Sequence, residues 1–223
     1  MSIAWQPSPN FQPRPDGMPV DMLVLHYTGM PSADAALRRM CDPAAEVSAH
    51  YMIDEQGFVT QLVAEEHRAW HAGKSFWRGH TDINGRSIGI EIVNPGHEHG
   101  YGAFPEAQIA SLIRLSRDIL ARWPIAARNV VGHSDVAPAR KQDPGELFPW
   151  RRLAGEGIGL WPAPVAEGGD VAAGLRDYGY GWEVDAELPL VVTAFQRHFR
   201  PQRCDGQVDA ETSSLLQGLL HAL

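Results

Sequence analysis

The sequence contains few cysteines, no excess of basic residues and no long apolar run. Its two cysteines, Cys41 and Cys204, lie far apart and form no C-x-x-C pair, which argues against a disulfide framework. The net charge of −8 at pH 7 argues against a nucleic-acid partner. No apolar run is long enough to span a bilayer, so no transmembrane segment is expected. What remains is a globular protein whose 44% hydrophobic residues can form a core.

The N-terminal residues also lack the apolar segment of a secretion signal. They are polar and rich in proline, which predicts an extended arm over residues 1–19. The expected location is therefore cytoplasmic. A periplasmic or outer-membrane-associated location is the alternative if the natural chain begins further upstream. A monomer is the default expectation for the oligomeric state.

Most of the chain alternates between short apolar runs and amphipathic stretches. Apolar, often β-branched runs predict strands at 20–26, 50–54, 58–62, 87–93 and 130–133. Apolar residues at helical spacing predict helices at 33–40, 105–123 and 148–153. This order of elements predicts an α/β fold with a mixed central β-sheet flanked by helices.

The chain changes character after residue 162. Residues 163–169 are rich in proline and glycine and show no apolar periodicity, which predicts a linker. The remaining residues, 170–223, predict three helices, at 171–178, 188–199 and 209–221. A unit of this size is too small for a deep active site, and it is typical of a binding module.

Candidate metal ligands lie where predicted strands end. His26 ends one apolar run, His133 follows another, and Asp143 lies ten residues after His133 in a turn-rich segment. Imidazole and carboxylate groups bind zinc, and three protein ligands leave a fourth position open, as in catalytic sites. The sequence therefore predicts one Zn²⁺ at His26, His133 and Asp143, with a merely hydrogen-bonded histidine as the alternative at each strand end. Asp135 and Arg140 are expected to shape the loop between the last two ligands.

Two further charged residues differ from their surroundings. Glu91 lies between isoleucines in a predicted strand, where a buried carboxylate is costly; the alternative is the solvent face of an edge strand. Lys141 and Lys74 are the two lysines among 19 basic residues. Because arginine is the usual cation of this chain, a lysine beside Asp143 indicates that a compact ammonium is needed there. A solvated loop lysine is the alternative.

These residues lie in segments that resemble the type-2 N-acetylmuramoyl-L-alanine amidases, zinc hydrolases that share the fold of peptidoglycan-recognition proteins. The matching segments cover most of residues 20–162 in the family's order: LVLHYT, VSAHYMID, AWHAG, SIGIEIVN, PARKQDPG and LFPW. Three C-terminal segments resemble the helical peptidoglycan-binding domain of the family's two-domain branch: YGYGWEVD, AFQRHFRP and DGQVDAET. Outer-membrane members of that branch carry a lipoprotein signal, which is not recognised here.

The resemblance implies a peptidoglycan-recognition-protein-like amidase fold with a small three-helix C-terminal domain. It implies hydrolysis of the amide bond between the lactyl group of (anhydro-)N-acetylmuramic acid and the L-alanine of the stem peptide, in peptidoglycan turnover or recycling. The partners would be peptidoglycan fragments, that is, muropeptides that include 1,6-anhydro forms. The resemblance assigns the zinc ligands to His26, His133 and Asp143, the general base to Glu91 and the oxyanion stabiliser to Lys141.

Other residues of the matching segments are expected near the substrate. His50 and His71 are predicted to contact the substrate or to support the ligands, with a purely structural role as the alternative. Trp70 is predicted to stack on a sugar or peptide face. His97 and His99 lie between glycines in an expected exposed loop, and they are assigned no role.

Two other functions remain open at this point. One is a peptidoglycan-recognition binder that has kept the cleft and lost catalysis; such binders usually lack a zinc ligand, whereas all three positions are filled here. The other is a phage-type lytic amidase that acts on intact cell walls. The spacing of residues does not distinguish the anhydro from the ordinary form of muramic acid.

Overall fold

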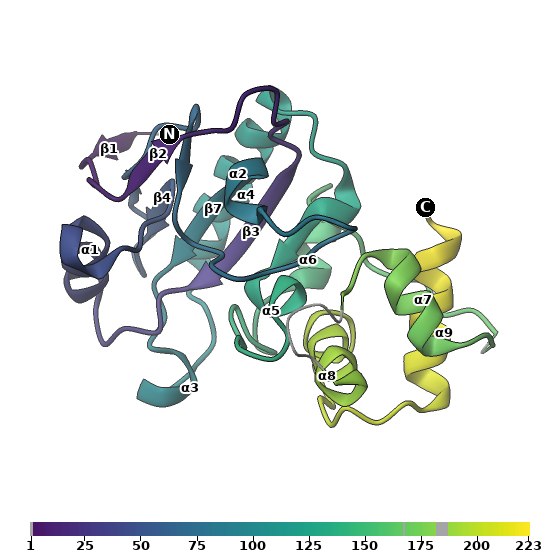
Figure 1. Ribbon diagram of the computed structural model, residues 1–223. Coiled ribbons are helices and arrows are strands. Elements are labelled where there is room, and N and C mark those ends of the chain that lie inside the picture. The colour runs from purple at the N-terminus through teal and green to yellow at the C-terminus, as the bar shows by residue number, and fades with distance from the viewer. Residues whose placement is uncertain (1, 167, 182–186) are drawn as a thin grey trace.

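A six-stranded sheet forms the centre of the protein (Figure 1). The computed structural model describes residues 2–166, 168–181 and 187–223. The strand order is β1-β5-β4-β7-β3-β8. The strands are β1 (Ile3–Trp5), β3 (Met22–Tyr27), β4 (Tyr51–Ile53), β5 (Val59–Gln61), β7 (Ser87–Ile92) and β8 (Val130–Gly132). Within the described residues β4 and β5 form an antiparallel hairpin and the other neighbours are parallel, so the predicted mixed sheet is confirmed.

The N-terminal residues are extended, as expected, but they are paired with the rest of the protein. β1 runs parallel to β5, and β2 (Phe11–Pro13) pairs with β6 (His67–Ala69) in a second, two-stranded sheet. The Arg14 guanidinium donates hydrogen bonds to the backbone carbonyls of Glu65, Asn84, Gly85 and Ser87. Residues 3–14 are therefore attached to the main fold by strand pairing and by the hydrogen bonds of Arg14.

Helices cover both faces of the sheet. On one face lie α4 (Glu106–Arg122) and α6 (Trp150–Gly155), whose apolar residues share a core cluster with β3 and β7. On the other face α1 (Ala33–Cys41) packs against Met52 of β4. Short helical segments are α2 (Ile83–Arg86), α3 (Gly96–His99), α5 (His133–Val136) and the 3₁₀ turns Pro43–Ala45 and Ala127–Asn129. Among the described residues, no helix has both the length and the apolar character that crossing a membrane requires.

The alternation of side chains along the strands separates the two faces of the sheet. On β3, Leu23 and Leu25 pack toward α4, whereas Val24 belongs to the cluster on the opposite face. His26 shares this opposite face because successive side chains of a strand point to opposite sides. The isoleucines of β7 likewise pack toward α4. Glu91 of β7 therefore lies on the same face as His26.

The three predicted C-terminal helices are present as α7 (Val171–Tyr178), α8 (Leu188–Phe199) and α9 (Ala210–His221). They lie together at one end of the molecule, beside α5 and α6 (Figure 1). Their apolar residues and Val24 of β3 belong to one continuous cluster. Residue 167 of the predicted linker and residues 182–186 of the loop after α7 lie outside the described residues. The helices are thus packed onto the sheet, and their role as a wall-binding domain stays a prediction.

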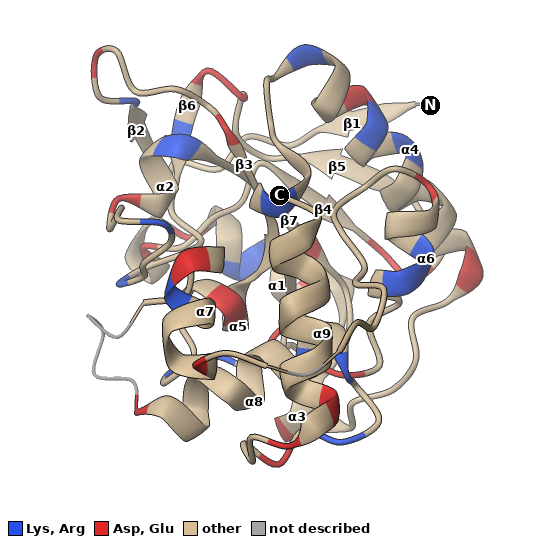
Figure 2. Ribbon diagram, turned by 90° about the vertical axis from the view of Figure 1, so that its right-hand side faces the viewer, with Lys and Arg blue, Asp and Glu red and all other residues tan. Residues whose placement is uncertain are grey.

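Charged residues are distributed over many elements of the chain. Figure 2, which views the molecule from the side of the C-terminal helices, shows blue and red segments interspersed along the ribbon. This distribution and the net charge of −8 give no support to a nucleic-acid partner.

Candidate active site

The three predicted metal ligands converge at the carboxyl ends of β3 and β8. His26 lies on β3, His133 begins α5 directly after β8, and Asp143 lies in the following loop. His26 Nδ1 lies 3.0 Å from His133 Nδ1 and 3.0 Å from Asp143 Oδ2, and His133 Nδ1 lies 3.1 Å from the same oxygen. A tetrahedral zinc ion with bonds of about 2.0–2.1 Å separates its ligands by about 3.3 Å. The triangle of donor atoms therefore has the size that zinc requires.

Hydrogen bonds behind His26 determine which of its nitrogens is free. The Ser87 hydroxyl donates to the Ile83 carbonyl at 2.6 Å, so it can only accept from His71 Nε2 at 3.2 Å. His71 Nδ1 then accepts from His26 Nε2 at 3.0 Å, which leaves His26 Nδ1 without a proton. Burial, followed by the proximity of His133, lowers the pKa of His26 to about 4, so this imidazole is neutral at pH 7.

His133 is oriented by a similar contact on the opposite side of the triad. Its Nε2 donates to the Ala72 carbonyl at 3.0 Å, so in the neutral imidazole the Nδ1 that faces His26 and Asp143 carries the lone pair. Two imidazole lone pairs and a carboxylate oxygen thus face one another within about 3 Å in a buried position, an arrangement that a cation would stabilise. The donor set of two nitrogens and one oxygen suits zinc.

Glu91 lies directly beside His26 in the sheet. The two residues are register partners on the parallel strands β7 and β3. β7 is bordered on its other side by β4, so Glu91 occupies a central strand and not the edge strand of the alternative interpretation. Its Oε2 is buried without a hydrogen-bond partner among the described residues. Burial, and then the charge of Asp143, hold the pKa of Glu91 well above its usual value.

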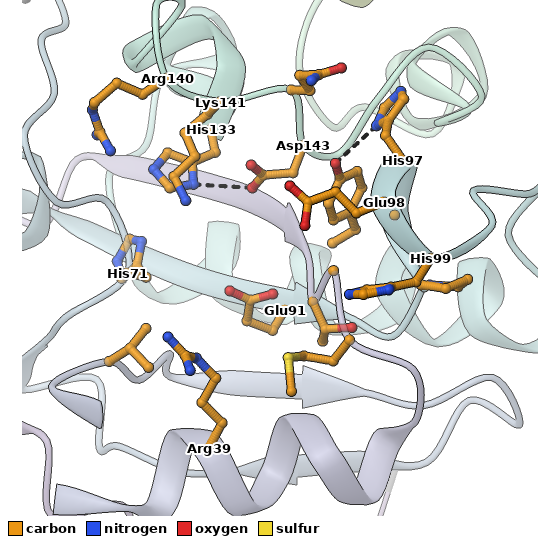
Figure 3. Close-up of a pocket in the computed structure, with 18 residues that line it drawn as sticks. Arg39, His71, Glu91, His97, Glu98, His99, His133, Arg140, Lys141 and Asp143 are labelled. Atoms are coloured by element: carbon orange, nitrogen blue, oxygen red, sulfur yellow. Dashed lines mark hydrogen bonds and ion pairs between the residues drawn. The ribbon is translucent and has the colours of Figure 1, made fainter. Parts of the chain in front are cut away.

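A cavity of about 510 Å³ opens above these residues and is partly lined by Glu91, His133, Lys141 and Asp143 (Figure 3). Lys141 enters it from the loop between the ligands, where its backbone N–H donates to the Ala137 carbonyl at 3.0 Å. The positive charge of Lys141 acts to lower the pKa of Glu91, which is a smaller effect than burial. Candidate metal ligands, a candidate base and a candidate cation therefore border one cavity.

The three predicted substrate contacts have different positions. His71 lines the cavity and also supports His26. His50 is fully buried; it accepts from the Gly89 N–H at 2.9 Å, donates to the His67 carbonyl at 3.0 Å and does not line the cavity. Trp70 is also absent from the cavity wall, and its indole N–H donates to Gln12 of β2 at 3.2 Å. Neither His50 nor Trp70 thus lines this cavity, and a contact of either residue with the substrate stays a prediction.

The sequence interpretation missed the helix α3, whose histidines His97 and His99 line the cavity (Figure 3). His97 Nδ1 lies 2.9 Å from the Tyr27 hydroxyl, and its Nε2 lies 3.1 Å from a Glu146 oxygen. The residue in the sequence that could have indicated this position is Gly96. It has φ +71°, and a Cβ added to it would lie 2.7 Å from the Tyr27 ring. The glycine thus permits a close approach of α3 to the cavity, whereas it was interpreted as a mark of exposure.

Asp135 and Arg140 support the ligand-bearing loop, as the sequence suggested. Asp135 Oδ2 accepts from the Gly132 N–H at 2.7 Å, directly before His133. The Arg140 guanidinium donates to the Ala72 carbonyl at 3.2 Å and to the Lys74 carbonyl. Ala72 therefore receives hydrogen bonds from both Arg140 and His133, which connects the two ends of this loop to one carbonyl.

Comparison with known proteins places this geometry in a family. The profile of the N-acetylmuramoyl-L-alanine amidase family (Amidase_2) matches residues 16–146. The N-acetylmuramoyl-L-alanine amidase AmiD of Escherichia coli K12 is 40% identical over 231 residues, covering 90% of this chain and 82% of AmiD. The 1,6-anhydro-N-acetylmuramyl-L-alanine amidase AmpD of Salmonella typhimurium SL1344 is 36% identical over 164 residues, covering 66% of this chain and 86% of AmpD.

Solved structures agree with the sequence relationship. E. coli AmiD, in complex with anhydro-N-acetylmuramic acid-L-Ala-D-γ-Glu-L-Lys, superposes with a TM-score of 0.82 and 39% identity, covering 95% of this chain and 93% of AmiD. AmpDh3 of Pseudomonas aeruginosa, in complex with an anhydromuramic pentapeptide, gives a TM-score of 0.84 and 36% identity, covering 93% and 94%. These matches include the C-terminal helices as well as the sheet. The chain therefore belongs to the N-acetylmuramoyl-L-alanine amidases.

Proposed function

We propose that this chain is a zinc-dependent amidase that hydrolyses the bond between the lactyl group of anhydro-N-acetylmuramic acid and the L-alanine of the stem peptide. The observation that carries the proposal is the convergence of three potential ligand atoms at one cavity beside Glu91, whose Oε2 has no hydrogen-bond partner among the described residues. The related AmiD and AmpDh3 structures contain anhydro-muropeptides, which supports this class of substrate.

The residues of the cavity divide the chemistry among them. His26, His133 and Asp143 would hold the zinc ion, which when bound supplies a Lewis acid and lowers the pKa of water. Glu91 accepts a proton from the attacking water and then delivers it to the amine of L-alanine as the amide bond breaks. Its raised pKa suits both steps, since the carboxylate holds the proton between them. Lys141 stabilises the negative charge that develops on the carbonyl oxygen.

Zinc removal tests the proposed function. Protein that has been freed of metal with a chelator and dialysed is expected to release peptide from anhydro-N-acetylmuramyl-tripeptide roughly 100-fold more slowly or worse, and added zinc should restore the rate. Chromatography of the released peptide measures both rates. A zinc-loaded protein that binds this muropeptide without cutting it would be a recognition protein. Cleavage restricted to intact wall would favour the lytic amidase instead.

Lys141→Met is expected to lower kcat by about 10²–10³-fold with little change in KM, because the ammonium acts on charge that develops in the transition state. The acidic limb of the pH profile of kcat/KM should also move to higher pH. Glu91 must be deprotonated to act as a base, and removing the positive charge of Lys141 raises the pKa of Glu91 further. Steady-state kinetics across pH measure both effects.

Lys74→Met is the matched control, since it removes the other lysine of the chain from a position outside the cavity wall. Its kinetic constants and pH profile should stay near those of the wild type. If Lys141→Met and Lys74→Met behaved alike, Lys141 would be a loop lysine without a catalytic role.

A further inference from the structure

Asp135 connects the metal loop to the C-terminal helices through a buried carboxylate. The side chain is 1% exposed. Its Oδ1 accepts a hydrogen bond from the Tyr180 hydroxyl at 2.7 Å, and its Oδ2 lies 2.7 Å from His198 Nδ1. The same Oδ2 accepts from the Gly132 N–H at 2.7 Å. Tyr180 follows α7 and His198 lies on α8, so one carboxylate joins the C-terminal unit (residues 170–223) to the end of β8.

The backbone that Asp135 holds leads directly into a metal ligand. Gly132 precedes His133, so the Gly132–Asp135 bond fixes the point from which the ligand side chain projects. A Cβ added to Gly132 would lie 2.7 Å from Cδ of Pro144, the residue after Asp143. The two ligand-bearing segments are therefore packed in contact here. A shift of Gly132 would move His133 relative to Asp143.

α8 also reaches the far end of the metal loop. Arg197 Nε lies 3.8 Å from Glu146 Oε2, and Glu146 in turn contacts His97 at the cavity. The His198 ring stacks on Trp150 of α6 with 3.7 Å between ring centroids. The helix thus contacts Asp135, two residues after His133, and also Glu146 and Trp150, which follow Asp143. The contacts of Asp135 with Tyr180 and His198 are buried, and hydrogen bonds of this kind to a carboxylate hold a position more firmly than contacts at a solvent-exposed surface do.

We propose that the C-terminal unit is a structural support of the metal centre, in which Tyr180 and His198 are positioning residues that act through Asp135 on His133. The inference rests on the proposed zinc-dependent function and adds a role that binding to the cell wall does not require. Its consequence is that the unit matters even for a small muropeptide. Partners that orient metal ligands commonly change metal affinity or activity by about 10–100-fold when they are removed.

Tyr180→Phe tests the proposal in the full chain with a small change of shape. The variant should bind zinc about 10-fold or more weakly, measured by competition with a chelating dye. On anhydro-N-acetylmuramyl-tripeptide, kcat should fall while KM changes little, because Tyr180 is buried and does not line the cavity. Tyr178→Phe is the matched control: Tyr178 is also buried in the C-terminal unit, but its hydroxyl makes no hydrogen bond with a described residue. Its zinc affinity and kcat should equal those of the wild type.

In Tyr180→Phe, His198 still contacts the Asp135 carboxylate and could hold it in place, so a second variant is needed. His198→Phe keeps a ring for stacking on Trp150 and removes the nitrogen at Asp135, and the double variant with Tyr180→Phe should weaken zinc binding further. Melting temperatures of the metal-free proteins separate a local effect from general unfolding. The proposal is overturned if both Tyr180→Phe and the double variant keep wild-type zinc affinity, or if Tyr178→Phe loses as much. Failure of the proposed function would show differently, as wild-type activity that needs no zinc.

Discussion

Replacing Glu91 with glutamine is expected to lower kcat by about 10²–10⁴-fold, the range that loss of a general base produces, while the zinc content stays at the wild-type level. Glutamine keeps the size of the side chain and cannot accept the proton. Glu91 lies beside His26 in the sheet but outside the triad of donor atoms, so the metal site should survive. Kinetics with anhydro-N-acetylmuramyl-tripeptide and metal analysis of the same sample measure the two results.

The pH profile gives this prediction a second readout. In the wild type kcat/KM should fall as the pH drops through the raised pKa of Glu91, because protonation removes the base. That limb should be missing from the residual activity of Glu91→Gln. Glu98→Gln serves as the control, since it removes an exposed carboxylate at the same cavity. A comparable loss of kcat in both variants would assign the effect to the negative charge of the cavity. Loss of zinc from Glu91→Gln would instead indicate that Glu91 is a metal ligand.

Asp143→Ala is expected to lose zinc, with an affinity reduced by well over ~100-fold, more than the loss of a supporting residue costs. The change removes the anionic member of the triad and leaves two imidazoles whose Nδ1 atoms lie 3.0 Å apart. Without the carboxylate, the positive charge of an ion at this buried position is no longer balanced. Metal analysis after dialysis measures the stoichiometry, and activity should decline in parallel with it.

Gln142→Ala is the appropriate control for Asp143→Ala, because it shortens the neighbouring side chain of the same loop and keeps all three donor atoms. It should retain one zinc ion per chain. Addition of excess zinc to Asp143→Ala should restore part of its activity if weak binding is the cause. Stoichiometric zinc in dialysed Asp143→Ala would contradict the assignment of this residue as a ligand.

The sequence was most informative where local pattern determines geometry. The apolar runs that end at His26 and His133 predicted buried strands, and the ends of parallel neighbours meet at one edge of the sheet. The isoleucines around Glu91 predicted a strand, and their alternation left the carboxylate on the other face. The periodicity of 105–123 similarly predicted α4 to within one residue at each end. These features depend on residues close together in the chain.

Features that depend on distant contacts escaped the sequence interpretation. β1 and β2 are short and exposed, and their partners β5 and β6 lie more than fifty residues away, so no local alternation marks them. The support of His26 by His71 requires space over Gly89, where a Cβ would lie 2.6 Å from the His71 ring. The apolar stripes of α7 to α9 predicted helices, but a stripe does not specify which surface covers it. That surface is partly the sheet that carries the site.

The metal triad also bears on the order in which the protein matures. His26 and Asp143 are separated by 117 positions in the chain. During synthesis the ligand set is therefore incomplete until Asp143 has left the ribosome, and its support from Tyr180 and His198 emerges later still. An ion that binds after all three ligands have been synthesised closes a long loop of the chain. Because it binds the folded chain, it shifts the folding equilibrium toward the native state. For the proposed zinc enzyme, the supply of zinc to newly made chains would thus be part of their folding as well as of their catalysis.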